Sequence, residues 1–209
     1  MSNSFDSEIE YDLTLKSPPI IIVPHQRRWK GEFEALASRL RRIVPDSVLR
    51  IDHIGSTSVP ELAAKDIIDV QMTVIDLDDL KDLRTAIHNC GFVFRNDIVS
   101  DNFVADTYPD PREWRKAYIR EPEGERRVHI HVRELDRCNQ RYALLFRDFL
   151  RANAAVRKGY QIAKVRLSKV FPECIDGYLY IKDPLMDIIF EGARLWADQT
   201  RWEPDSDHF

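Results

Sequence analysis

The chain has 209 residues, of which 44% are hydrophobic and 32% are charged. This length suits one sizeable core and is short for two, and the composition excludes disordered, collagen-like and membrane classes. The formal net charge is −4, from 31 basic and 35 acidic residues, which argues against a general nucleic-acid binder.

The cysteines and the N-terminus indicate the compartment. Cys90, Cys138 and Cys174 are far apart and form no CxxC, so neither a disulfide framework nor a thiolate zinc site is expected. The N-terminus lacks a basic start followed by an apolar run, and the apolar run at 20–23 is too short to span a bilayer. We therefore expect a cytoplasmic protein without a membrane segment.

The first elements follow an acidic start. Residues 1–16 are predicted to be a flexible acidic leader. The β-branched run at 20–23 predicts a strand. The apolar spacing that follows predicts a helix over 27–44, ended by Pro45. The apolar positions of this helix are Trp29, Phe33, Leu36, Leu40 and Ile43.

Two strands and a helix come next. Residues 48–54 predict a strand, and 67–74 predict another with apolar residues on both faces, as in a covered central strand. Asp76 is expected to cap a helix that Gly91 ends. A further strand is predicted at 92–94.

The middle of the chain has a weaker pattern. Within 96–126 we expect two irregular strands, near Phe103 and near Tyr118, and a mobile loop at 120–126. Residues 127–133 alternate between apolar and polar side chains, which predicts a regular strand.

Helices dominate the C-terminal part. Two are predicted, at about 139–151 and 154–170. The last helix is expected to begin with Asp183 as its cap and Pro184 in its first turn. Residues 201–209 are predicted to be a polar, frayed tail.

The most unusual stretch lies between His53 and Asp69. Gly55 permits a sharp turn after a strand, and hydroxyls with adjacent amides can surround an anion. Lys65 adds a point charge, and Asp69 on the next strand can hold a divalent cation that bridges to phosphate. The alternative is a common Ser/Thr-rich turn beside a buried Asp. The three hydroxyls are those of Ser56, Thr57 and Ser58.

A second set of candidates follows from strand periodicity. Asp69 and Gln71 share one face of their strand, as do His129 and His131 of theirs. If the strands are adjacent and aligned, one carboxylate and two imidazoles converge, with His53 as a further candidate. That set suits Zn²⁺, Mn²⁺ or Fe²⁺ better than Mg²⁺, or supplies a general base. The alternative is histidines that bond only to their neighbours.

Residues 133–169 carry ten basic against three acidic side chains. This excess indicates either a solvated helical face or a wall that attracts phosphates. Arg147 has the alternative of a structural ion pair with Asp148. The candidates for phosphate contact are Arg137, Arg141, Arg147, Arg151 and Lys164.

These motifs resemble the GrpB family over about residues 20–197. The resemblance implies an α/β (α+β), nucleotidyltransferase-like mixed sheet flanked by helices, with C-terminal helices, in one domain over 17–200. A related domain is fused to some bacterial dephospho-CoA kinases. Glu61 stands where the family usually has Gly. The residues that carry the resemblance are His53–Pro60, Leu62–Lys65 and Ile67–Val70. It continues at Val23-Pro24 with Trp29 and Phe33, at His129–Val132, at Leu145–Asp148, at Tyr160 with Lys164, and at Lys182–Pro184.

The resemblance also implies a catalytic pattern. In the superfamily, Gly-Ser begins a turn, a later strand carries carboxylates at i and i+2, and a neighbouring strand carries a third. Here Gly55-Ser56 and Asp69 match, but Gln71 stands at the second carboxylate position. The third position corresponds to the strand of His129 and His131. An amide does not supply the anionic oxygen that a second Mg²⁺ needs.

The leading hypothesis is an enzyme that binds a nucleotide or another phosphorylated small molecule and transfers a nucleotidyl or phosphoryl group. Ser56, Ser58 and Lys65 would bind phosphate, and Asp69 would hold the metal. The implied cofactors are Mg²⁺ or Mn²⁺, ahead of Zn²⁺, and ATP or another nucleotide. The alternatives are a catalytically degenerate binding protein, and a metal-dependent hydrolase or lyase that uses Asp69, His129 and His131. The sequence leaves the substrate and the oligomeric state open.

Overall fold

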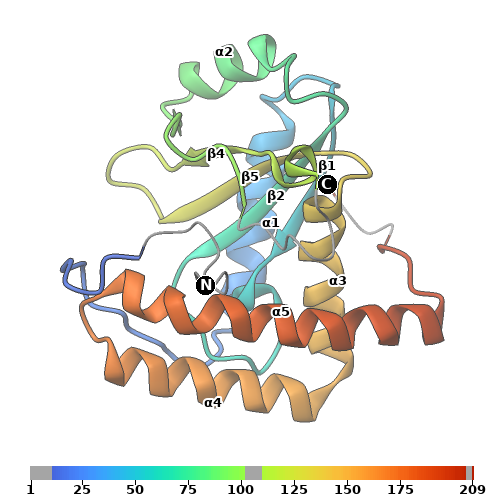
Figure 1. Ribbon diagram of the computed structural model, residues 1–209. Coiled ribbons are helices and arrows are strands. Elements are labelled where there is room, and N and C mark those ends of the chain that lie inside the picture. The colour runs from blue at the N-terminus through green and yellow to red at the C-terminus, as the bar shows by residue number, and fades with distance from the viewer. Residues whose placement is uncertain (1–10, 102–109, 206–208) are drawn as a thin grey trace, which may run out of the picture.

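The computed structural model describes residues 11–101, 110–205 and 209. A five-stranded mixed sheet, in the order β1-β2-β5-β4-β3, is flanked by helices and followed by three C-terminal helices (Figure 1). This confirms the expected architecture. The strands are β1 (Val48–Ile54), β2 (Ile68–Val74), β3 (Val93–Phe94), β4 (Ala117–Arg120) and β5 (Val128–Glu134). The helices are α1 (Arg28–Arg41), α2 (Lys81–Asn89), α3 (Cys138–Ala152), α4 (Ala154–Val170) and α5 (Ile175–Thr200), with short 3₁₀ turns η1 (Ser56–Ser58) and η2 (Pro111–Trp114).

Strand β2 lies between β1 and β5 in the sheet. It pairs antiparallel with β1 and parallel with β5. In the parallel pair, Asp69 lies opposite His129 and Gln71 lies opposite His131. Because paired residues point to the same face, these four side chains share one side of the sheet.

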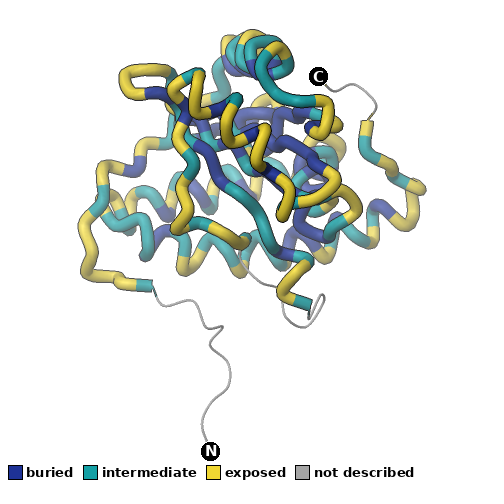
Figure 2. Tube along the Cα trace, turned by 90° about the horizontal axis from the view of Figure 1, so that it is seen from above, coloured by how far each residue is buried: buried dark blue, intermediate teal, exposed yellow. Residues whose placement is uncertain are grey.

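The two faces of the sheet differ in chemistry. Val70 and Met72 of β2 and Ile130 of β5 are 0% exposed and pack into the main core against α1. Leu40, also 0% exposed, is part of the same core from the α1 side. Figure 2 shows the buried residues gathered in the interior of the molecule, with exposed residues around them. The opposite face is called here the polar face; it carries Asp69, Gln71 and Thr73 of β2 and His129, His131 and Arg133 of β5.

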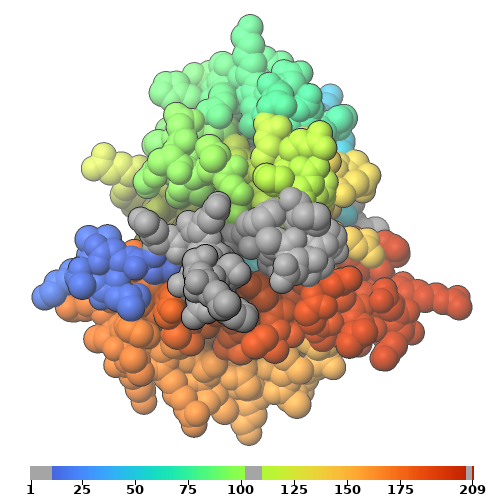
Figure 3. Space-filling model, viewed as in Figure 1, coloured from blue at the N-terminus to red at the C-terminus, as the bar shows by residue number. Residues whose placement is uncertain are grey.

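The C-terminal helices form a second layer with its own core. Phe149 and Leu150 of α3 pack with Phe190 and Ala193 of α5, and Tyr160 joins them from α4. In the space-filling view, α4 and α5 form one side of the molecule and the α2–β3 region forms the other (Figure 3). The site lies between the sheet and this helical layer.

Several boundaries differ from the sequence-based predictions. The predicted strand at 20–23 is reduced to a single bridge between Val23 and Ala64. Flanking prolines lack N–H donors, and Ile20 donates its own N–H to Pro172 O instead. The α2 helix begins at Lys81 rather than directly after a cap at Asp76.

The last helix also begins earlier than predicted. It starts at Ile175, and Pro184, expected in the first turn, lies inside it. Cys174 rather than Asp183 is the N-cap, because its Sγ accepts from Gly177 N–H. Burial of Tyr178, which is 1% exposed, gives the first turns a tertiary partner that the local pattern did not reveal.

Other predictions hold closely. The β1 strand has the predicted bounds, and β2, β5, α3 and α4 lie within a residue or two of theirs. Glu61, where the family usually has Gly, has a φ of 65°, in the left-handed region that favours glycine. The predicted strand near Phe103 lies outside the described residues.

The two ends contact the body of the protein where they are described. Tyr11, in the predicted leader, donates its hydroxyl to Asp183 at 3.0 Å. In the predicted frayed tail, Phe209 exchanges two backbone hydrogen bonds with Ile51, at the free edge of β1. Among the helices that the structure describes, none combines the length and apolarity needed to cross a bilayer.

Replacing Ile130 with Ala tests the core beneath the polar face. The side chain is fully buried, so we expect Ile130→Ala to lower the free energy of unfolding by about 2–5 kcal/mol. The control is Ile75→Ala, at a side chain that is 64% exposed, with a change within about 0.5 kcal/mol. Urea denaturation of both variants measures the difference, and equal effects would contradict this description of the core.

Candidate functional site

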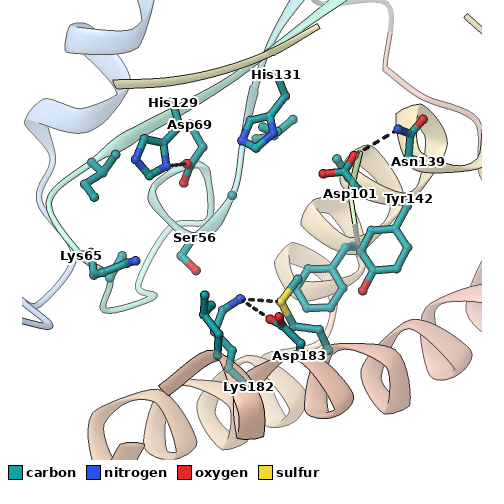
Figure 4. Close-up of a pocket in the computed structure, with 18 of the residues that line it drawn as sticks. Ser56, Lys65, Asp69, Asp101, His129, His131, Asn139, Tyr142, Lys182 and Asp183 are labelled. Atoms are coloured by element: carbon teal, nitrogen blue, oxygen red, sulfur yellow. Dashed lines mark hydrogen bonds and ion pairs between the residues drawn. The ribbon is translucent and has the colours of Figure 1, made fainter. Parts of the chain in front are cut away.

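A cavity of about 900 Å³ lies between the polar face and the helices α3, α4 and α5. That size is ample for a nucleotide-sized ligand. Eight basic and five acidic side chains line it, together with a group of aromatic rings. Figure 4 shows side chains from both layers pointing into this space, with Asp69 and His129 above and Lys182 and Asp183 on α5 below.

Asp69, His129 and His131 form a cluster on the sheet side of the cavity. One potential ligand atom from each lies within 4.8 Å of the others. The His129 Nδ1 atom is 3.2 Å from Asp69 Oδ1 (Figure 4). The register between β2 and β5 therefore brings these three side chains together, as predicted for adjacent and aligned strands.

The surroundings set the charge of this cluster. Burial opposes ionisation of Asp69, but the hydrogen bond from His129 and the positive charge of Lys65 outweigh it, so the pKa of Asp69 is lowered. Burial, helped by the positive charges of Arg133 and Lys116, holds the pKa of His131 well below its usual value. The anionic carboxylate of Asp69 thus lies near the neutral imidazole of His131, whose Nδ1 is 3.4 Å from Arg133 Nη2.

The turn after β1 packs directly against Asp69. Gly55 has φ 69° and ψ −173°, a conformation open to glycine and strained for other residues. A Cβ atom at this position would lie 2.8 Å from Asp69 Cγ. The sharp turn predicted at Gly55 is confirmed, and a side chain there would collide with the carboxylate.

Basic side chains face the cluster from the helical layer. Lys164 of α4 donates to Ser56 Oγ at 2.8 Å and to Ala63 O at 2.7 Å, which ties α4 to the turn. Lys65 and Lys182 line the same cavity. In Figure 4 the Ser56 hydroxyl points into the space above Lys182.

Three predicted site residues do not face the cavity. His53 points to the opposite side of the sheet, where its ring stacks on Phe33 at 4.6 Å between centroids. Its Nε2 is 3.0 Å from Thr57 Oγ1, so these two side chains satisfy each other. Ser58 donates its hydroxyl to Gly55 O. The expected trio of hydroxyls around an anion is therefore reduced to Ser56.

Gln71 is fully buried beside the cluster and bonds only within the protein. Its Nε2 donates to Gln140 O, and its Oε1 accepts from Arg133 Nη1 at 2.6 Å. Arg133 also makes an ion pair with Asp101. The second carboxylate position of the superfamily pattern is thus occupied by an amide that binds a guanidinium.

The other predicted basic contacts are used elsewhere. Arg147 lines the cavity but gives its guanidinium to Asp148 and to His53 O, which confirms the structural ion pair. Arg151 donates to Ser58 O, behind the turn. Arg137 pairs with Glu113 and Glu134, and Arg141 with Glu203, so neither closes over the cavity.

Several residues that line the cavity were not predicted as site residues. Asp101 and Lys116 pair at 2.7 Å, and both come from the segment whose pattern was weakest. Lys182 lies on a part of α5 that was expected to precede the helix. Tyr142 and Tyr160 have the spacing of core residues, and only the packing of three helices shows that they also border the cavity.

Comparison with known proteins places this geometry in a family. The family model described as GrpB protein matches residues 19–191. The chain belongs to the GrpB family. A crystal structure of the conserved protein GrpB from Enterococcus faecalis is similar, with a TM-score of 0.67 and 29% identity over 84% of this chain and 99% of that chain.

Curated GrpB-like relatives differ in length. The chain is 30% identical to the dephospho-CoA kinase of Mycolicibacterium paratuberculosis, over 89% of this chain and 49% of the relative. It is 27% identical to a UPF0157 protein of Halalkalibacterium halodurans, over 83% of this chain and 82% of the relative. The chain therefore spans about half the length of the kinases it matches.

Replacing Gly55 with Ala tests the contact between the turn and Asp69. Gly55→Ala adds both backbone strain and a collision, whereas Gly124→Ala, at φ 79° with no heavy atom within 4 Å, adds strain alone. We expect Gly55→Ala to cost about 1–3 kcal/mol more than the control, by urea denaturation. Equal costs would show that the turn does not press on the carboxylate.

Proposed function

We propose that this GrpB-family chain is a metal-dependent enzyme that transfers a phosphoryl or nucleotidyl group from a nucleotide or another phosphorylated small molecule. The observation that carries the proposal is one cavity that combines the Asp69–His129–His131 cluster with the lysines of the opposite wall. A metal-type donor set and fixed positive charge are the two requirements for binding and activating a phosphate.

The donor set fits one divalent cation. One carboxylate oxygen and two imidazole nitrogens suit Mn²⁺, Zn²⁺ or Fe²⁺, while Mg²⁺ prefers oxygen ligands throughout. Asp69, His129 and His131 would hold the ion, and positions not filled by protein would be left for water and substrate. A bound cation supplies charge neutralisation at the phosphate.

The polar face favours a single cation over two. A second ion would have to approach Gln71, but Arg133 Nη1 already lies 2.6 Å from its amide oxygen. Asp101, the nearest further carboxylate in this network, is engaged by Arg133 and Lys116. The protein's own guanidinium thus supplies the positive charge beside the cluster.

The remaining walls suit the rest of a phosphorylated ligand. Ser56, Lys65 and Lys182 supply the polar contacts expected for phosphate oxygens. Aromatic and apolar side chains from η2, α3 and α5 offer a surface for an organic group such as a base. These are Trp114, Tyr142, Phe146 and Met186.

A second candidate function is binding without transfer. Gln71 in the second carboxylate position favours it, because the two-metal mechanism of the superfamily needs an anionic ligand there. The mycobacterial relatives are named dephospho-CoA kinases, but this chain matches only about half of their length. Their kinase activity is therefore not proposed for this chain.

Metal binding is the first test. We expect isothermal titration calorimetry to show one Mn²⁺ or Zn²⁺ per chain, with His131→Ala and Asp69→Asn each weakening the affinity at least about 10-fold. The control is His88→Ala, at an exposed position on α2, which should leave the affinity unchanged. Unchanged affinity in both cluster variants would remove the cluster from the proposed function.

Ligand binding is the second test. In the presence of Mn²⁺, we expect at least one of ATP, GTP and CTP to raise the melting temperature, since ligands that bind the folded state stabilise it. Lys182→Met should reduce this shift because it removes a positive charge from the cavity, while Lys158→Met, at an exposed residue of α4, should not. Absence of any shift with a folded sample would count against nucleotide binding.

A further inference from the structure

Ser56 and Lys164 form a close pair inside the cavity. Lys164 Nζ lies 2.8 Å from Ser56 Oγ, and the Lys164 side chain is held by Ala63 O at 2.7 Å. Lys164 is 2% exposed, whereas Ser56 is half-buried and lines the cavity. A buried amine thus contacts a hydroxyl that a ligand can reach, which is the arrangement of a nucleophile and its base.

The surroundings of Lys164 favour the neutral amine. Burial lowers the pKa of Lys164 from 10.5 to about 7, and the positive charges of Lys182 on α5 and Lys65 before β2 act in the same direction. Asp69 on β2 opposes this shift. Tyr160, on the same helix, hydrogen-bonds with Ser56, and burial raises the pKa of Tyr160, so its hydroxyl stays neutral.

We infer that Ser56 is a nucleophile that accepts the phosphoryl group of the substrate, with Lys164 as its general base. This inference rests on the proposed function, which it deepens by naming the first acceptor. It also supplies what the polar face lacks, since activation of the attacking oxygen is otherwise the task of a second metal ion.

The chemistry balances without a further co-reactant. Ser56 Oγ attacks phosphorus while its proton moves to the neutral Lys164 Nζ, and the bond from phosphorus to the leaving oxygen breaks. The leaving group takes the electron pair and receives the proton from Lys164. In the second step, water or an acceptor hydroxyl attacks phosphorus, its proton passes to Lys164, and Ser56 leaves with that proton restored.

The structural alternative is that Lys164 only ties α4 to the turn. Both roles need the same distances, so stability alone does not separate them. The two roles predict different reactivity of Ser56. If Lys164 is only structural, Ser56 is as unreactive as an ordinary serine hydroxyl. If Lys164 is a general base, Ser56 reacts with phosphorus electrophiles.

The test is labelling by an alkyl fluorophosphonate, in EDTA and without nucleotide, followed by intact mass and peptide mapping. The wild-type chain should form one adduct at Ser56, with loss of fluoride. The rate should rise with pH through about 7 and then level off, since the base acts only when deprotonated. Ser56→Ala should abolish the adduct, and Lys164→Met should slow it at least about 100-fold.

Matched controls are Ser168→Ala and Lys158→Met, both on α4 and outside the cavity, which should label as the wild type does. Lys164→Arg serves as a second variant if Lys164→Met does not fold. Its guanidinium is permanently charged and does not deprotonate, so this variant should also label slowly. Two results would overturn the inference: no adduct on the folded wild type, or an adduct that forms at the same rate in the wild type and in the Lys164 variants.

The outcome is separable from that of the proposed function. The probe needs neither metal nor nucleotide, so labelling at Ser56 with no metal or nucleotide binding would leave the inference standing and remove the proposed function. Metal and nucleotide binding with an unreactive Ser56 would do the reverse.

Discussion

The parallel pairing of β2 with β5 is the interaction on which the candidate site depends. Its register sets Asp69 beside His129 and Gln71 beside His131. A slip of one residue would turn one of these sets to the other face of the sheet. Packing on the other face of the sheet fixes this register, because the alternating residues of both strands are buried in the main core and leave no room for a shifted pairing. Hydrophobic packing on one face therefore positions the polar chemistry on the other.

The helical layer turns this polar face into a cavity. Helices α4 and α5 bring Lys164 and Lys182 over the strands, where burial lowers the pKa of Lys164 and Asp69 opposes that shift. Under the proposed function, an anionic ligand would compensate the positive charges that line the cavity. The tie from Lys164 to Ser56 and Ala63 also couples α4 to the turn at Gly55.

The polar face departs from the two-metal pattern in a chemically consistent way. Gln71 replaces an anionic ligand, and Arg133 bonds to it while pairing with Asp101. The guanidinium of Arg133 thus lies where the two-metal pattern would place the second metal ion. Under the proposed function, a single metal position leaves activation of the nucleophile to another group. Ser56, the only hydroxyl of the η1 turn that faces the cavity, lies against the buried Lys164.

The sequence by itself determined the sheet strands β1, β2 and β5, the helices α3 and α4, the glycine turn and the strand face that His129 shares with His131. Each of these follows from local periodicity or from the conformational freedom of glycine. Tertiary structure decided the rest. It turned His53 away from the site, paired Thr57 and Ser58 within the protein, and moved the start of α5 to Ile175. It also brought in Asp101, Lys116 and Lys182. These outcomes depend on which distant side chains come into contact, and spacing along one chain carries no information about that.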